Sequence, residues 1–268
     1  MPEDPVQRAL FDTGMAWAED YKEALEEVDI YNEGLHLFGR YYDFGADSAV
    51  IILPGRMESC LYSLYFAEPY RAAGRNVLVI DNRAHGLSDG RYNSLGHHEH
   101  KDVIKWAEFL RDEKGIRDIV LHGCCIGAAN AVFTATDKNC PEEVKALITE
   151  GMFATFSESF KNHLIKEKKP VFPFKLGFSL IVRLVTGADI LHDGPYYRIP
   201  ALKIPILMLH SREDIFSLPE KAQVLYDRCG SEKKIVWFDR GEHSRIRFAD
   251  REAYDCAIGD FLSGIRRN

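Results

Sequence analysis

Residues 118–129 have the sequence DIVLHGCCIGAA. An apolar, β-branched run ends at Gly123, and Cys125 stands between this glycine and Gly127, which small residues typical of a helix start follow. The pattern predicts a strand, a sharp turn with Cys125 at its apex, and a helix. Glycines two residues before and after the apex let the strand and the helix pass closely. The N–H of Ile126, at the helix N-terminus, then points at whatever the Cys125 side chain attacks.

Composition restricts the class of protein. The 268 residues are 46% hydrophobic, enough for the core of a single α/β domain over 1–268. A net charge of −7 argues against a nucleic-acid partner. The N-terminus lacks an apolar signal core, and no run is long and uncharged enough to form an integral membrane segment. The six cysteines are scattered without metal-ligand spacing, which favours reduced thiols and a cytoplasmic location.

Apolar runs alternate with helical periodicity along most of the chain. Strands are expected at 28–31, 35–41, 49–53, 76–81, 118–123, 144–150, 205–210 and 234–239. Helices are expected over 6–27, 61–73, 99–114 and 249–266. This order predicts the α/β class, with a mainly parallel eight-stranded sheet flanked by helices.

Residues 152–200 lose this alternation and become aromatic, apolar and basic. The segment predicts a helical lid inserted within the single domain. Its composition allows two interpretations: a surface that attracts anionic or amphiphilic substrates or rests on a membrane, or helices that pack on the domain with lysines in water. Exposed aromatic residues here leave both a monomer and a homodimer open.

A thiol is a poor nucleophile until it loses its proton, so Cys125 needs a nearby base and a group that orients the base. His243 lies in the loop after the last strand, and Asp214 follows the strand before it. His243 and Asp214 are therefore candidates for the base and the orienting acid beside Cys125, and the resemblance described below implies that they form one catalytic set. Glu150, at the end of another strand, is a rival for the acid, while Cys124 is expected to point into the core.

Neither a cofactor nor a metal site is predicted. His97, His98 and His100 lie close together at a helix start, but no cluster of carboxylates and cysteines accompanies them. A solvated first turn of the helix is the expected environment of these histidines.

Three motifs resemble those of the α/β-hydrolase superfamily. Residues 123–127, GCCIG, are similar to its nucleophile elbow, with cysteine where serine is usual. Residues 54–59, PGRMES, look like its first oxyanion loop, with proline in place of a histidine. Residues 81–90 resemble its Asp-x-Arg-Gly-x-Gly-x-Ser loop, with alanine for the first glycine. The resemblance implies the α/β-hydrolase fold, the chain order Cys125, Asp214, His243, and oxyanion donors at the N–H groups of Arg56 and Ile126.

The lid and the loop after residue 81 look closest to the esterase and acylpeptidase-like branches, and the cysteine resembles that of dienelactone hydrolases. The resemblance implies hydrolysis of a carboxylic ester, thioester or lactone, with a hydrophobic small-molecule acyl substrate and an acyl-cysteine intermediate. Three alternatives stay open: a catalytically silent binding protein, a cysteine replacing a natural serine, and acyl transfer to an acceptor other than water. Glu58 is expected either near the thiol, as a carboxylate is in dienelactone hydrolases, or exposed to solvent.

Overall fold

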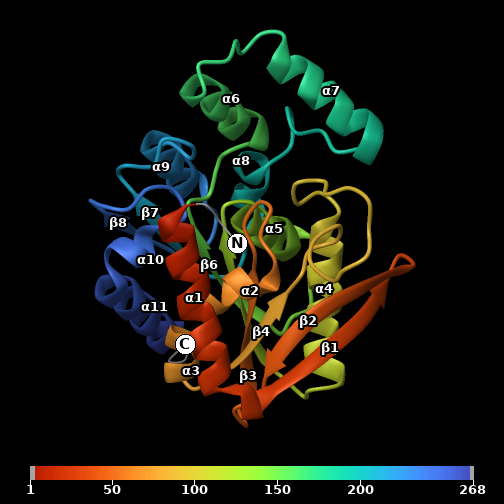
Figure 1. Cartoon of the computed structure of the whole chain (residues 1–268), viewed down its shortest axis with the longest axis vertical. Helices are drawn as coiled ribbons and strands as arrows, with labels where there is room; N and C mark the ends of the chain where they lie inside the picture. Colours follow the sequence, from red (N-terminus) through yellow and green to blue (C-terminus); the bar gives the residue numbers. More distant parts are fainter. Residues whose placement is uncertain (1–3, 266–268) are drawn as a thin grey trace.

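Eight strands form one twisted sheet in the computed structural model, which describes residues 4–265 (Figure 1). The strands are β1 (Leu25–Asn32), β2 (Leu35–Tyr42), β3 (Ser48–Leu53), β4 (Asn76–Ile80), β5 (Asp118–Cys124), β6 (Val144–Glu150), β7 (Ile206–Ser211) and β8 (Lys233–Phe238). Their order across the sheet is β1-β2-β4-β3-β5-β6-β7-β8. β2 pairs antiparallel with β1 and β4, and the remaining neighbours are parallel. The mainly parallel eight-stranded sheet is therefore confirmed.

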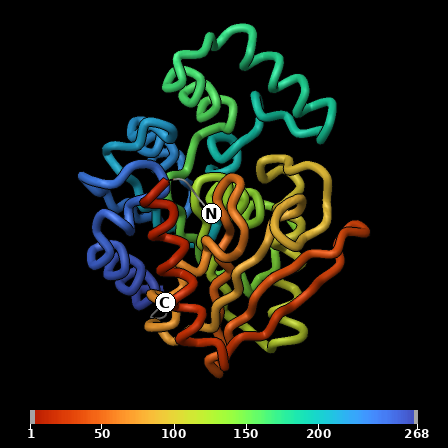
Figure 2. The backbone as a smooth tube through the Cα atoms, in the orientation of Figure 1, coloured from red at the N-terminus to blue at the C-terminus, as the bar shows by residue number. Residues whose placement is uncertain are grey.

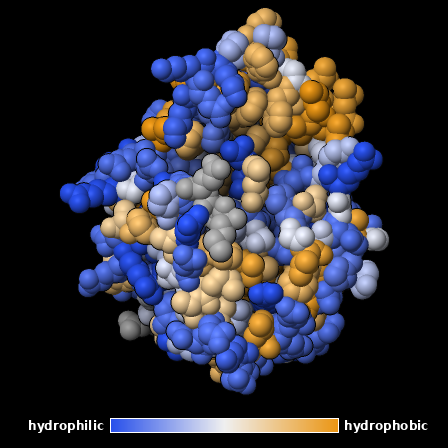
Figure 3. Space-filling model, viewed as in Figure 1, coloured by the Kyte–Doolittle hydropathy of each residue, from blue (hydrophilic) through white to orange (hydrophobic). Residues whose placement is uncertain are grey.

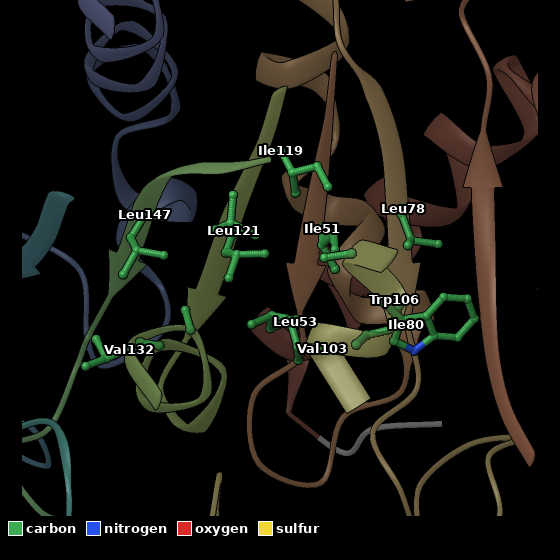
Figure 4. Packing of buried hydrophobic residues seen from close by; sticks show 14 of the residues in the cluster. Ile51, Leu53, Leu78, Ile80, Val103, Trp106, Ile119, Leu121, Val132 and Leu147 are labelled. Atoms are coloured by element: carbon green, nitrogen blue, oxygen red, sulfur yellow. The ribbon is translucent and has the colours of Figure 1, made fainter. Parts of the chain in front are cut away.

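Successive side chains of the central strands enter two different cores, because a strand directs them to opposite faces. In β3, Ile51 belongs to the core on one face and Ile52 to the core on the other. Leu78 and Val79 of β4 divide in the same way. Figure 4 shows the first core, where Trp106 lies among strand side chains. Burial on both faces explains why these strands read as continuous apolar runs.

Helices cover both faces of the sheet. α4 (Glu99–Asp112), α5 (Ile126–Thr136) and α9 (Pro219–Arg228) contribute to the first core, and α1 (Pro5–Asp20), α3 (Glu68–Ala72) and α11 (Arg251–Ile265) contribute to the second. The shorter helical elements are η1 (Lys22–Ala24), α2 (Cys60–Ser63), η2 (Leu64–Phe66) and α10 (Ile246–Ala249).

Two of the expected helices differ from the helices that the structure shows. The first helix ends at Asp20 and not at residue 27, because 25–27 pair with β2 as part of β1. The helix expected over 61–73 is three short pieces, and the last of them has a proline in its first turn, where the missing N–H costs least. Residue 266 of the closing helix lies outside the described residues.

The segment inserted between β6 and β7, residues 152–200, contains α6 (Phe156–Lys166), α7 (Phe174–Thr186) and α8 (Pro195–Arg198), followed by η3 (Ile199–Ala201). In Figure 1 and Figure 2, α6 and α7 project beyond the rest of the molecule. Phe160 of α6 stacks on Phe178 of α7 with 4.3 Å between ring centroids, which ties the two helices together. The helical nature of this segment is confirmed, and its role as a lid stays a prediction. Among the described residues, no helix is long and apolar enough to cross a membrane.

Candidate active site

Cys125 lies at a strained turn between β5 and α5. Its backbone has φ 54° and ψ −110°, a region that side-chain-bearing residues rarely adopt. A Cβ on Gly123 would lie 2.2 Å from the carbonyl carbon of Gly127, and a Cβ on Gly127 would lie 2.3 Å from the carbonyl oxygen of Leu53. Both contacts are far inside van der Waals distance, so the turn closes only with glycine at these positions. Cys125 is half-buried, whereas Cys124 points into the core, as predicted.

His243 is held by Asp214. The two side chains come from the loops that follow β8 and β7, and the Nδ1 of His243 lies 2.7 Å from the Oδ2 of Asp214. The other oxygen of Asp214 accepts hydrogen bonds from the backbone N–H groups of Phe216 and Ser217, at 2.9 and 2.8 Å. An ionised carboxylate only accepts, so Nδ1 carries the proton and Nε2 is left to act on a neighbour.

The charges around His243 favour its protonated form. Burial alone lowers the pKa of His243, but the Cys125 thiolate and the Asp214 carboxylate together raise it well above its usual value. Burial also acts on Asp214, where it raises the pKa, but the interaction with His243 outweighs burial and lowers the pKa overall. The pair of His243 and Asp214 therefore favours an imidazolium beside a carboxylate.

Glu150, the rival acid, has other partners. It is fully buried at the end of β6, where its two oxygens accept from the backbone N–H of Ile246 at 3.2 Å and from the hydroxyl of Tyr254 at 2.7 Å. Burial raises the pKa of Glu150 to about 7. The carboxyl therefore anchors the loop that carries His243 and does not orient the imidazole.

The two predicted oxyanion donors lie on adjacent elements. Ile126 is the first residue of α5, where backbone N–H groups have no partner within the helix. Arg56 follows β3, whose Leu53 is paired with Gly123 of β5, so the loop after β3 begins beside the turn at Cys125. Arg56 and Cys125 line the same cavity.

Glu58 is not fully exposed to solvent, one of the two environments that the sequence allowed. It is half-buried and lines the cavity that contains Cys125. Its two oxygens accept from the backbone N–H of Gly55 at 2.9 Å and from the side-chain amide of Gln7 at 3.0 Å. Burial raises the pKa of Glu58. Gln7 belongs to α1, so the N-terminal helix reaches the site, which the sequence did not predict.

The cavity at Cys125 has a volume of about 350 Å³. Its lining residues come from the first helix, the loop after β3, the turn at Cys125, the inserted segment and the last two loops: Gln7, Gly55, Arg56, Met57, Glu58, Tyr62, Cys125, His163, Phe216, His243 and Ser244. A second cavity of about 470 Å³ shares Arg56 and His163 with it and extends along α6 to Leu164 and Phe174. The second cavity is mostly apolar.

His163 and Phe216 are residues of the site that the sequence did not single out. Their rings stack with 3.9 Å between centroids, and Phe216 meets His243 edge to face at 5.7 Å. Burial, together with the positive charges of Arg56 and His243, lowers the pKa of His163 to about 4, so its ring is neutral at pH 7. The position of Phe216, two residues after Asp214, could have indicated that it lies in the site. No sequence pattern indicated His163.

His97, His98 and His100 do not form the solvated turn that was expected. His100 is buried and lies 3.1 Å from the carboxylate of Asp137, and Nε2 of His98 lies 2.6 Å from the carbonyl of Thr186. Nδ1 of His97 lies 3.0 Å from the carbonyl of Ser94, so each of the three rings has a hydrogen-bond contact within the protein. Within residues 4–265, no group of three or more His, Cys, Asp or Glu side chains is arranged to hold a metal ion.

Comparison with known proteins gives relatives of the same fold. The sequence pattern of a family described as "alpha/beta hydrolase fold" matches residues 48–170. The uncharacterized protein YqkD of Bacillus subtilis is 26% identical over 220 residues, which cover 81% of this chain and 72% of that protein. The esterase Pf2001 of Pyrococcus furiosus superposes with a TM-score of 0.78 at 23% identity, over 92% of this chain and 93% of the esterase. The alpha/beta hydrolase domain-containing protein 10 from mouse gives a TM-score of 0.67 at 19% identity, over 90% and 99% of the two chains.

Proposed function

We propose that this chain, which has the α/β-hydrolase fold, hydrolyses a carboxylic ester, thioester or lactone through an acyl intermediate on Cys125. One observation carries the proposal. A cysteine at a strained turn shares a cavity with His243, and Asp214 holds that imidazole at 2.7 Å.

In the proposed reaction the thiolate of Cys125 attacks the carbonyl carbon of the substrate. The resulting oxyanion accepts hydrogen bonds from the N–H groups of Arg56 and Ile126, each worth about 3 kcal/mol in the transition state. His243, protonated in the resting pair, donates its proton to the leaving oxygen or sulfur as the tetrahedral intermediate collapses. It then removes a proton from water, which attacks the acyl-thioester and regenerates the thiol.

The apolar second cavity supports a hydrophobic acyl group as the substrate class. It shares the lining residues Arg56 and His163 with the first cavity and extends to Leu164 and Phe174. An acyl chain bound to Cys125 would lie along α6, and the inserted segment would act as the lid over it. Burial of each methylene contributes about 0.8 kcal/mol, so affinity should rise with chain length until the cavity is full.

Hydrolysis of p-nitrophenyl esters of increasing chain length tests the proposal. Cys125→Ala should reduce turnover to the uncatalysed rate while leaving the circular dichroism spectrum unchanged, because alanine removes only the sulfur. Cys125→Ser is the matched variant, and faster turnover in this form would identify the thiol as a replacement for serine. Turnover by Cys125→Ala at the parent rate would reject the mechanism.

Thiol alkylation separates an enzyme from a silent binding protein. A thiolate stabilised by His243 should react rapidly with iodoacetamide at neutral pH, and His243→Asn should slow this reaction. Equal rates in the parent and the variant would favour the binding protein.

A further inference from the structure

The outward face of α7 is apolar and exposed to solvent. Leu180 is 57% exposed and Leu184 is 76% exposed, and Phe172, just before the helix, is 77% exposed. The spacing of Leu176, Leu180 and Leu184 puts them on one side of the helix. Figure 3 shows the hydrophobic patch over α7 at the outer end of the molecule. Patches of this kind mark interaction sites.

This face is not needed to attach the helix. The opposite side of α7 packs on the molecule through Phe178, Ser179 and Val182, of which the last two are buried. α7 therefore has one face packed on the protein and a second apolar face that no other described part of the chain covers.

The charge around α7 is opposite to that of the whole chain. Residues 160–186 hold six Lys and Arg residues and one carboxylate, a charge of +5, whereas the chain carries −7. Lys161 and Lys168 are exposed, and neither makes an ion pair among the residues that the structure describes. An apolar face on a segment that also carries exposed, unpaired cations is complementary to an anionic lipid surface.

We propose that the outward face of α7 docks on an anionic phospholipid bilayer, with its leucines among the acyl chains and the lysines at the phosphates. The helix has 13 residues and a length of about 20 Å, shorter than the roughly 30 Å of a bilayer core, so it lies in the interface. A second copy of the chain is a poorer occupant, because a two-fold contact would bring two segments of charge +5 together.

Docking of α7 would also fix the orientation of the second cavity relative to the bilayer. Phe174, the first residue of α7, and Lys169 of the same inserted segment line this cavity. If the cavity receives the acyl group, as in the function proposed above, a hydrophobic substrate would reach it from the bilayer.

Sedimentation with vesicles tests the docking directly. The full chain should bind vesicles that contain phosphatidylglycerol more tightly than phosphatidylcholine vesicles, and salt should weaken this binding. Each lost cation should weaken binding about fivefold, so Lys161→Glu with Lys168→Glu should weaken it at least 25-fold. Leu180→Asp with Leu184→Asp should abolish it, without changing the melting temperature.

Two controls keep the result specific. Tyr31→Asp changes an exposed aromatic residue on β1, far along the sheet from the insertion, and should bind as the parent does. Cys125→Ala should also bind normally, so failure of docking and failure of the proposed chemistry are distinguishable. Binding unaffected by the leucine or lysine substitutions would overturn the proposal. The proposal would also be overturned if the parent chain does not bind vesicles but forms a dimer, and if Leu180→Asp with Leu184→Asp dissociates that dimer. The occupant of the α7 face would then be a second copy of the chain.

Discussion

Replacing Asp214 by asparagine should abolish most of the activity by reversing the hydrogen bond to His243. One oxygen of Asp214 accepts from the N–H groups of Phe216 and Ser217, so the asparagine must keep its own oxygen there. Its NH₂ group then faces the Nδ1 of His243, which has to become an acceptor. The imidazole proton moves to Nε2, and the ring can no longer take a proton from Cys125.

The magnitude follows from this change of tautomer. A similar substitution in a catalytic triad lowers kcat by about 10⁴, which corresponds to about 5 kcal/mol in the activation barrier. We expect a loss of 10³ to 10⁴ in kcat, measured with a p-nitrophenyl ester at pH 7. The alkylation rate of Cys125 should fall in parallel, because removing the carboxylate lowers the pKa of His243 and with it the population of the imidazolium.

Glu150→Gln is the matched control. It neutralises the rival acid while its amide can still bond Ile246 and Tyr254, so activity should stay within about threefold of the parent. A variant Asp214→Asn that retains full activity, together with an inactive Glu150→Gln, would refute the assignment of the acid.

Further predictions concern stability and chain-length preference. Gly127→Ala should destabilise the protein by about 2 to 4 kcal/mol in urea unfolding, because its Cβ meets the Leu53 carbonyl, whereas Gly177→Ala, with open space around it, should be neutral or stabilising. His163→Ala should raise KM for octanoyl esters about fivefold and leave acetyl esters almost unchanged, because it removes about 40 Å² of apolar wall where the two cavities meet. The buried carboxyl of Glu150 binds a proton more tightly in the folded state than in the unfolded state, so its contribution to stability falls as the pH rises from 4.5 to about 7. This decrease in the free energy of unfolding amounts to about 3 kcal/mol, and Glu150→Gln should remove it. If the free energy of unfolding depends on pH in the same way in the parent and the variant, the burial effect is contradicted.

Much of the architecture is encoded locally. Continuous apolar runs predicted the buried strands, and β6 was placed at its observed bounds. Gly123 and Gly127 predicted the turn at Cys125, because the steric demand of that turn falls on residues two positions away. The end of the first helix was missed because pairing with β2 outweighs the helical periodicity of residues 25–27.

The class of fold, the turn at Cys125 and the order of the candidate residues along the chain all follow from local sequence patterns. The choice between Asp214 and Glu150 as the partner of His243 needed the tertiary structure, because the two acids lie at the ends of adjacent parallel strands. The hydroxyl of Tyr254, on α11, donates a hydrogen bond to Glu150. The tertiary structure also brought Gln7, Glu58 and His163 to the cavity that contains Cys125. Backbone periodicity and steric limits act between neighbours in the chain, whereas hydrogen-bond partners and cavity walls depend on distances between segments that are far apart in sequence.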